Sequence, residues 1–162
     1  RLGILIEKAQ KRGVEANRLV FAEKVPHPIH LARQKLADVF VDTFNVNAGV
    51  TVGDALWVGL PVVTKLGKGM AARVGGMILE ALNMPELITK SEEEYEALLL
   101  ELATNPKRLS TIKEKLAANR LTTPLFDIKF FTKNIENGYQ QAYQRYFDKK
   151  LPENIMVPTI RN

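Results

Sequence analysis

The residues best suited to binding chemistry lie in segment 47–54, which reads Asn-Ala-Gly-Val-Thr-Val-Gly-Asp. The surrounding pattern predicts a strand before this segment and a helix that begins near Thr51, so that the free N–H groups of the first helical turn point outward. Together with the positive end of the helix dipole they suit an anion such as a diphosphate. Gly49 would let a phosphate approach closely, and the Thr51 hydroxyl can donate a further hydrogen bond.

A purely structural interpretation of the same residues stays open. Thr51 and Asp54 have the spacing of a capping box, with Asp in place of the usual Glu or Gln. On that interpretation the two side chains stabilise the start of the helix and bind no ligand.

A second candidate group lies between Val25 and Arg33. His30 and Arg33 are three residues apart, so they share one face of a short helix that Pro28 can open. An imidazole can stack on a flat base, and a guanidinium can donate to the carbonyl oxygens of that base. The alternative is a surface helix that carries two polar residues with no ligand.

Three other features carry weaker signals. The loop 65–70 lacks the spacing of a P-loop and of a dinucleotide fingerprint, so we interpret it as a turn at the mouth of the site, with Lys68 a candidate neighbour of a phosphate. We expect Trp57 to lie in the core. Residues 92–94, three consecutive glutamates, are typical of a solvated helix start.

The elements that must position these residues alternate between strands and helices. We expect strands near residues 18–23, 38–42, 61–64 and 87–88, and helices near 2–12, 28–36, 51–58, 71–82, 91–104, 106–119 and 127–148. This order predicts an α/β fold, with a Rossmann-like parallel sheet, covering helices and a helical C-terminal third. Ligands of such sheets bind beyond the carboxyl ends of the strands, which here are the loops after Glu23, Asp42 and Thr64.

Composition narrows the classes of protein further. The 162 residues include 46% hydrophobic residues, enough for one domain with a core, and no cysteine, which excludes disulfides and thiolate metal sites. The net charge of +5 is spread along helices and mixed with Glu, which argues against nucleic acid as a partner. No apolar run suggests a membrane partner, and we expect a cytoplasmic protein. Because the chain opens at Arg1 inside a helical pattern, we expect it to be part of a larger protein.

Several segments together resemble one family. They are residues 36–43, Asn47, Thr51, residues 54–64, 72–74, 84–88 and 121–126, and the final helix with Tyr139, Tyr143 and Tyr146. They are similar to the donor-binding region of the O-linked N-acetylglucosamine transferases, including the bacterial and SPINDLY-like members. The resemblance covers nearly the whole chain.

The resemblance implies a GT-B glycosyltransferase, in which two Rossmann-like lobes face a cleft behind tetratricopeptide repeats. This chain would be the C-terminal lobe, truncated at its N-terminus. Residues 1–126 would form the partial nucleotide-sugar-binding lobe, and residues 127–162 a helix and tail that pack back across the lobes.

The resemblance also assigns roles. His30 and Arg33 would contact the base, with the Val25 backbone beside it. Thr51 and the helix that it opens would hold the diphosphate, and Asp54 would bind the ribose hydroxyls.

Three positions depart from the better-known members of the family. Those members carry histidine and threonine where this chain has Gly49 and Val50, so diphosphate contacts here would come mostly from the backbone. They carry lysine where this chain has His27, and an imidazole is shorter and only partly charged near neutral pH.

The expected function is the binding of UDP-N-acetylglucosamine by an inverting enzyme that modifies Ser or Thr of a protein acceptor. The nucleotide sugar would be a substrate, with no metal or other cofactor. No catalytic base is assignable, the acceptor would bind the missing lobe and repeats, and we expect the chain alone to be inactive. Two alternatives stay open: a GDP-fucose donor, or a non-catalytic nucleotide-binding or interaction module. The sequence does not indicate the oligomeric state.

Overall fold

A computed structural model describes residues 2–158 of the chain, which separates into two compact units, residues 1–30 and 31–162. The first unit holds helix α1 (Leu2–Gln10), the short helix η1 (Ala16–Arg18) and the start of α2 (His27–Gln34). The helix predicted near residues 2–12 is confirmed to within two residues, and a turn that includes Gly13 follows it. Gly13 has φ +76°, and Val14 N donates to Ala9 O at 3.0 Å, which closes the last turn. We predicted a domain boundary after residue 126, which differs from this division after residue 30. The boundary after residue 126 stays a prediction.

The strand predicted near residues 18–23 is wrong. Residues 16–18 form η1, and residues 19–26 belong to no helix or strand. A strand exists only with a hydrogen-bonded neighbour, and the described part of the chain pairs none with this segment. The side chain of Val20 is accordingly 89% exposed.

The other three predicted strands are confirmed and form one parallel sheet in the second unit. They are β1 (Phe40–Val41), β2 (Val62–Lys65) and β3 (Ile88–Thr89), in that spatial order. Phe40 lies opposite Val62, and Thr64 lies opposite Ile88. All three strands therefore end at the same edge of the sheet, which we call the carboxyl edge.

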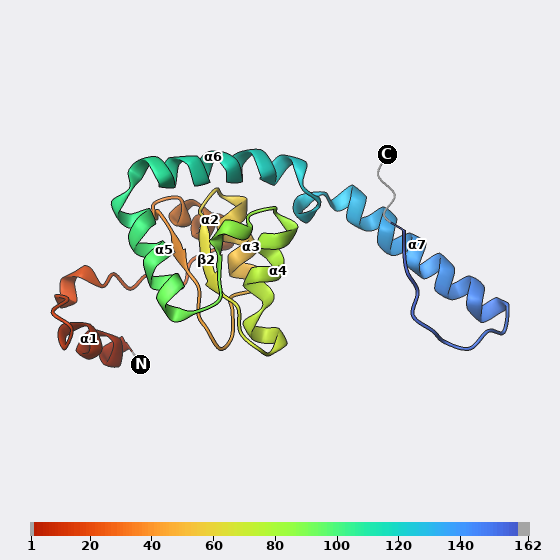
Figure 1. Ribbon diagram of the computed structural model, residues 1–162, viewed down its shortest axis with the longest axis horizontal. Helices are drawn as coiled ribbons and strands as arrows, with labels where there is room; N and C mark the ends of the chain where they lie inside the picture. The colour runs from red at the N-terminus through yellow and green to blue at the C-terminus, as the bar shows by residue number, and fades with distance from the viewer. Residues whose placement is uncertain (1, 159–162) are drawn as a thin grey trace. The chain divides into compact units, whose positions relative to one another are not determined.

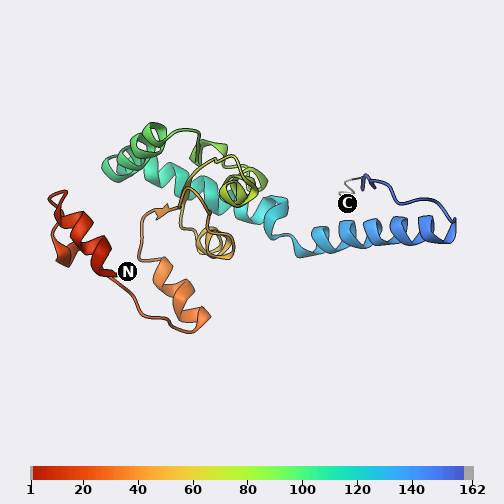
Figure 2. The ribbon, with the colours of Figure 1, turned by 90° about the horizontal axis from the view of Figure 1, so that it is seen from below.

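The predicted helices are confirmed to within a few residues. They are α3 (Val50–Trp57), α4 (Val74–Ala81), α5 (Glu92–Thr104), α6 (Pro106–Thr122) and α7 (Ile128–Phe147), with short helices η2 (Met70–Ala72), η3 (Pro85–Leu87) and η4 (Pro124–Phe126). Figure 1 shows α5 on one side of β2 and α3 and α4 on the other. Figure 2, seen from below, shows α5 and α6 side by side. None of the helices within residues 2–158 has the length and apolar character needed to cross a membrane.

Side-chain caps explain where α5 begins. Ser91 Oγ accepts a hydrogen bond from Glu94 N at 3.1 Å, and Glu94 Oε2 accepts one from Lys90 N at 2.7 Å. These reciprocal bonds resemble a capping box. They differ from it in one respect: Glu94 accepts from the N–H of Lys90 and not from that of the N-cap residue Ser91. The predicted solvated start over residues 92–94 is confirmed, since all three glutamates are exposed.

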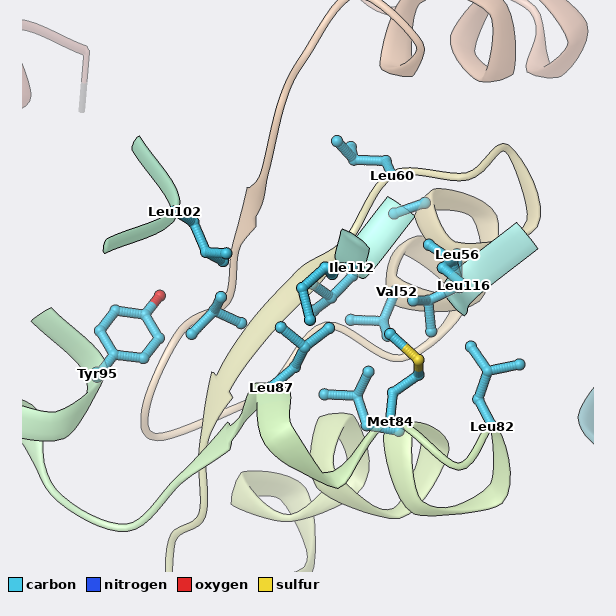
Figure 3. Close-up of a cluster of buried hydrophobic side chains, with 14 residues drawn as sticks. Val52, Leu56, Leu60, Leu82, Met84, Leu87, Tyr95, Leu102, Ile112 and Leu116 are labelled. Carbon is cyan, nitrogen blue, oxygen red and sulfur yellow. The ribbon is translucent and has the colours of Figure 1, made fainter. Parts of the chain in front are cut away.

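The hydrophobic core joins α3, β2, α4 and α6 (Figure 3). Val52, Ala55 and Leu56 form the buried face of α3 at the spacing that one helix face requires. The prediction that Trp57 lies in the core is wrong. It follows Leu56 by one residue and so leaves the buried face, and it is 49% exposed with its ring edge-on to Phe126 at 5.2 Å.

Gly75 lets the start of α4 approach the carboxyl edge of the sheet. A Cβ atom at this position would lie 2.6 Å from Asp42 Oδ2 and 2.8 Å from Thr64 Oγ1. Both oxygens belong to buried residues. Only glycine fits between them without a shift of α4 or of the sheet.

We predict that Gly75→Ala lowers the free energy of unfolding by about 1–3 kcal/mol, because overpacking forces the buried neighbours to move. Gly53→Ala is the matched control, since a Cβ there meets nothing within 4 Å inside α3. That variant should be neutral or stabilise the protein by about 0.5–1 kcal/mol. Urea denaturation of both variants checks this, and equal stabilities would contradict the packing that we describe.

Candidate functional site

A buried carboxylate organises the loop that leads from β1 to α3. Asp42 follows β1 and is 3% exposed. Its Oδ1 accepts hydrogen bonds from the backbone N–H groups of Thr43 and Ala48, each at 2.8 Å. Its Oδ2 accepts one from Thr64 Oγ1 of β2 at 2.7 Å. One side chain thus fixes both ends of the loop to the central strand.

Asn47 ties the same loop to the residues that open α4. Its Nδ2 donates to Thr43 O at 2.6 Å, and its Oδ1 accepts from Gly75 N at 3.2 Å. Its backbone N–H donates to Ala71 O at 2.8 Å. We call these polar groups the carboxyl-edge network; it comprises Asp42, Thr43, Asn47, Ala48, Thr64 and Gly75. The network holds the start of α3 in one position relative to the sheet.

The N-terminus of α3 emerges directly from this network. Gly49 is the N-cap residue, and its carbonyl oxygen accepts from Val52 N at 3.1 Å and Gly53 N at 3.2 Å. Within residues 2–158, the backbone N–H groups of Gly49, Val50 and Thr51 have no acceptor. Val50 and Thr51 are exposed. These are the open N–H groups that the sequence predicts at the start of this helix, and that an anion binds them stays a prediction.

The capping interpretation of Thr51 is wrong. The helix begins one residue earlier than predicted, so Thr51 lies within the first turn, and Gly49 makes no side-chain cap. The hydroxyl of Thr51 is therefore not engaged in holding the helix end. Thr51 and the half-buried Asp54 lie three residues apart, on one face of α3.

Gly49 has room for a side chain. Its φ of −90° suits any residue, and a Cβ atom there would meet only Val74 Cγ1, at 3.9 Å. The glycine is thus not required by packing. A diphosphate at this position would be contacted by the backbone alone, because no side chain is present, although one would fit.

The residues expected to contact the base lie on or beside α2. His27 opens this helix and is exposed, whereas His30 and Arg33 lie one turn on and are half-buried. Val25, His27 and His30 belong to the first unit, and Gly49, Val50, Thr51 and Asp54 to the second. That the two groups form a single site stays a prediction from the resemblance.

Tyr95 is a contributor to the carboxyl edge that sequence reasoning missed. Its hydroxyl donates to Asp42 O at 2.7 Å, and its ring packs edge-on against Phe44 at 5.0 Å. Burial, reinforced by the negative charge of Asp42, raises the pKa of Tyr95 to about 12. Its position near the start of a predicted helix gave no sign of this contact across 53 residues.

Two further expectations can be placed in the structure. Lys68 is exposed on the loop after β2. Within the described residues, no three side chains of His, Asp or Glu gather as metal ligands would. That the site needs no metal stays a prediction.

We predict that Asp42→Asn lowers the free energy of unfolding by about 1–3 kcal/mol, because hydrogen bonds to an ionised carboxylate become weaker neutral ones. Asp38→Asn is the matched control, since its side chain is 80% exposed, and should change stability by less than about 0.5 kcal/mol. Urea denaturation at neutral pH measures both. A loss no larger for Asp42→Asn than for Asp38→Asn would contradict the network's role.

We predict that stability falls between about pH 10 and pH 12. The pKa of Tyr95 is raised from the ordinary value of 10.0 to about 12, so this tyrosine ionises at a lower pH in the unfolded chain than in the folded one. The stability that the neutral tyrosine contributes is complete below about pH 10 and is lost as pH rises through 12. Tyr95→Phe should remove this part of the decline, whereas Tyr139→Phe, whose side chain is 68% exposed, should retain it. Denaturant unfolding at several pH values tests this, and parallel profiles for both variants would refute it.

Comparison with known proteins shows which family this chain resembles. Residues 3–135 match the model of glycosyl transferase family 41. The chain is 34% identical over 150 residues to the probable UDP-N-acetylglucosamine–peptide N-acetylglucosaminyltransferase SEC of Arabidopsis thaliana, covering 92% of this chain and 15% of that protein. It is 35% identical over 136 residues to the UDP-N-acetylglucosamine–peptide N-acetylglucosaminyltransferase of Caenorhabditis elegans, covering 84% of this chain and 12% of that one.

A solved structure agrees with the fold. A mutant of the O-GlcNAc transferase of Thermobaculum terrenum superimposes with a TM-score of 0.82 at 28% identity, covering 91% of this chain and 28% of that chain. This chain therefore spans only a small part of each relative's length. Because the family model matches well over half of the chain, the chain belongs to glycosyl transferase family 41.

Proposed function

We propose that this chain is the donor-binding lobe of a glycosyltransferase that moves N-acetylglucosamine from UDP to Ser or Thr hydroxyls of proteins. One observation carries the proposal: the open N-terminus of α3, with three backbone N–H groups that lack acceptors within residues 2–158. It lies at the carboxyl edge of a parallel sheet, where ligands of such folds bind. The relatives named above bear UDP-N-acetylglucosamine in their names, which favours a uridine donor over the guanosine alternative.

The donor would bind in three parts. Its diphosphate would accept hydrogen bonds from the N–H groups of Gly49, Val50 and Thr51, with the Thr51 hydroxyl beside them. The Asp54 carboxylate, three residues further along α3, would accept from the ribose hydroxyls.

The uracil would be bound by α2. His30 offers a flat imidazole for stacking, and Arg33 offers donors for the carbonyl oxygens of the base. The Val25 backbone and His27 would lie beside the nucleotide. This half of the proposal rests on the sequence resemblance and on the position of His30 and Arg33 on one face of α2.

The same N–H groups suit the chemical step. As an acceptor hydroxyl forms its bond to the anomeric carbon, the bond from that carbon to the diphosphate oxygen breaks, and negative charge grows on the departing UDP. Fixed donors aimed at that charge stabilise it without reorganising, because the carboxyl-edge network has already set their direction. The acceptor's proton would pass to a group outside this chain.

The wider setting is part of the same proposal. We infer a two-lobed GT-B enzyme in the cytoplasm, with tetratricopeptide repeats and an acceptor groove contributed by other parts of the protein. The parallel sheet with its covering helices, and the 28% of the Thermobaculum chain that this chain covers, support a lobe within a larger enzyme.

We predict that Asp54→Ala and Arg33→Ala each weaken UDP binding roughly ten-fold or more, since a charge-assisted hydrogen bond contributes about 1.5–3 kcal/mol. Glu80→Ala, which removes an exposed carboxylate from α4, is the control and should leave UDP binding unchanged. Isothermal titration of each folded variant with UDP gives the affinities, and a parallel titration with GDP should show weaker binding to the unaltered chain.

The outcomes separate the parts of the proposal. Wild-type affinity in both Asp54→Ala and Arg33→Ala would place the nucleotide elsewhere. An effect of Asp54→Ala alone would retain the site on α3 and reject the role of α2. Tighter binding of GDP than of UDP would reject the uridine donor.

A further inference from the structure

A cavity with a volume of about 580 Å³ lies at the edge of the sheet opposite the carboxyl edge. Trp57 at the end of α3 forms one wall. Lys35, between α2 and β1, forms another, and α6 closes the third side with Lys113 and Arg120. All of these residues belong to the second unit, so the cavity forms within one compact body.

This cavity is separate from the proposed donor site. It lies where the chain enters β1 and β2, whereas Asp42 and Gly49 lie where the chain leaves β1. Leu60 lines the cavity, and Figure 3 shows this residue on the loop that leads from α3 into β2. The eight residues of α3 span about 12 Å at 1.5 Å per residue, so the two sites face opposite ends of that helix.

The cavity carries an excess of positive charge. Lys35, Lys113 and Arg120 all line it, and no carboxylate does. Asp38 Oδ1 pairs with Lys113 Nζ at 3.1 Å, but that carboxylate is 80% exposed. Lys35 makes no ion pair within the described residues. Two of the three positive charges are therefore uncompensated.

Arg120 is held in place, but one of its hydrogen-bond donors has no acceptor among the described residues. One of its terminal nitrogens donates to Trp57 O, and its guanidinium lies 5.5 Å from the centre of the Trp57 ring. Its Nε is buried and has no hydrogen-bond partner among residues 2–158. Capping the end of α3 explains the bond to Trp57 O. It does not explain the unpaired Nε or the two lysines that line the same cavity.

We propose that this cavity binds a small phosphorylated anion. The cations Lys35 and Lys113 would meet its phosphate groups from two sides, and the guanidinium of Arg120 would form the floor with the half-exposed Trp57 ring. A compact polyanion suits the site because its charge is met by several donors at once. The open mouth of the cavity leaves the affinity dependent on ionic strength.

Trp57 makes the proposal directly testable, because it is the only tryptophan in the chain. Inorganic pyrophosphate is the probe, added to the folded chain at constant ionic strength while Trp57 fluorescence is recorded. We expect a saturable change with a dissociation constant of about 1 mM or below, and a weaker affinity when sodium chloride is raised.

Single-charge variants assign the signal to the cavity. Lys35→Gln and Lys113→Gln should each weaken pyrophosphate binding about five-fold, as expected for the loss of one partly solvated charge. Asp38→Asn should strengthen binding, because it frees Lys113 from its carboxylate. Lys107→Gln removes an exposed lysine of α6 that does not line the cavity and should leave the titration unchanged.

The proposal is overturned if fluorescence does not saturate, or if sodium sulfate at matched ionic strength gives the same change as pyrophosphate. It is also overturned if Lys35→Gln and Lys113→Gln retain the original affinity, or if Lys107→Gln weakens binding as much as they do. Circular dichroism of each variant confirms that it is folded before it is titrated. Pyrophosphate can also reach the amides at the start of α3, so the loss of affinity in Lys35→Gln and Lys113→Gln is what assigns the signal to the cavity.

Discussion

The buried carboxylate of Asp42 is the interaction on which the candidate site depends. It receives hydrogen bonds from both ends of the loop after β1 and from Thr64 of the central strand. Tyr95 adds a bond to the backbone of the same residue, and Gly75 leaves the space that the carboxylate occupies. A loop held at both ends has little freedom, so the first N–H groups of α3 keep their direction. A site that must stabilise a developing charge benefits from such preorganisation.

Much of the fold could be predicted from local sequence patterns, and the predictions that were wrong have a common cause. Apolar periodicity predicted the helices and the three paired strands, because that signal acts over a few residues. The segment near residues 18–23 has the composition of a strand but no neighbour in the described chain, and pairing is not a local property. Trp57 was misplaced for a similar reason: its exposure is set by which face of α3 packs on the core, and its residue type does not reveal that face.

The site divides in the same way. Gly49 and Thr51 could be singled out because a strand followed by a helix start is a recognisable pattern for anion binding. Asp42 and Tyr95 could not, since an acid at the end of a strand and a tyrosine in a helix acquire their roles only through contacts between distant segments. The free amides, and not the side chains, are the part of the site that the fold itself defines. The cationic cavity at the other end of α3 likewise depends on residues from three separate elements.

The central claim is that the amides of Gly49, Val50 and Thr51 hold the diphosphate of a uridine nucleotide. Two-dimensional ¹H–¹⁵N NMR of the labelled chain during titration with UDP tests it most directly, because each amide reports separately. The account predicts that these three resonances shift most among the amides of α3 and its preceding loop, and that uridine lacking phosphates leaves them unchanged. Saturable binding of UDP with these resonances unmoved, while other amides shift, would contradict the account.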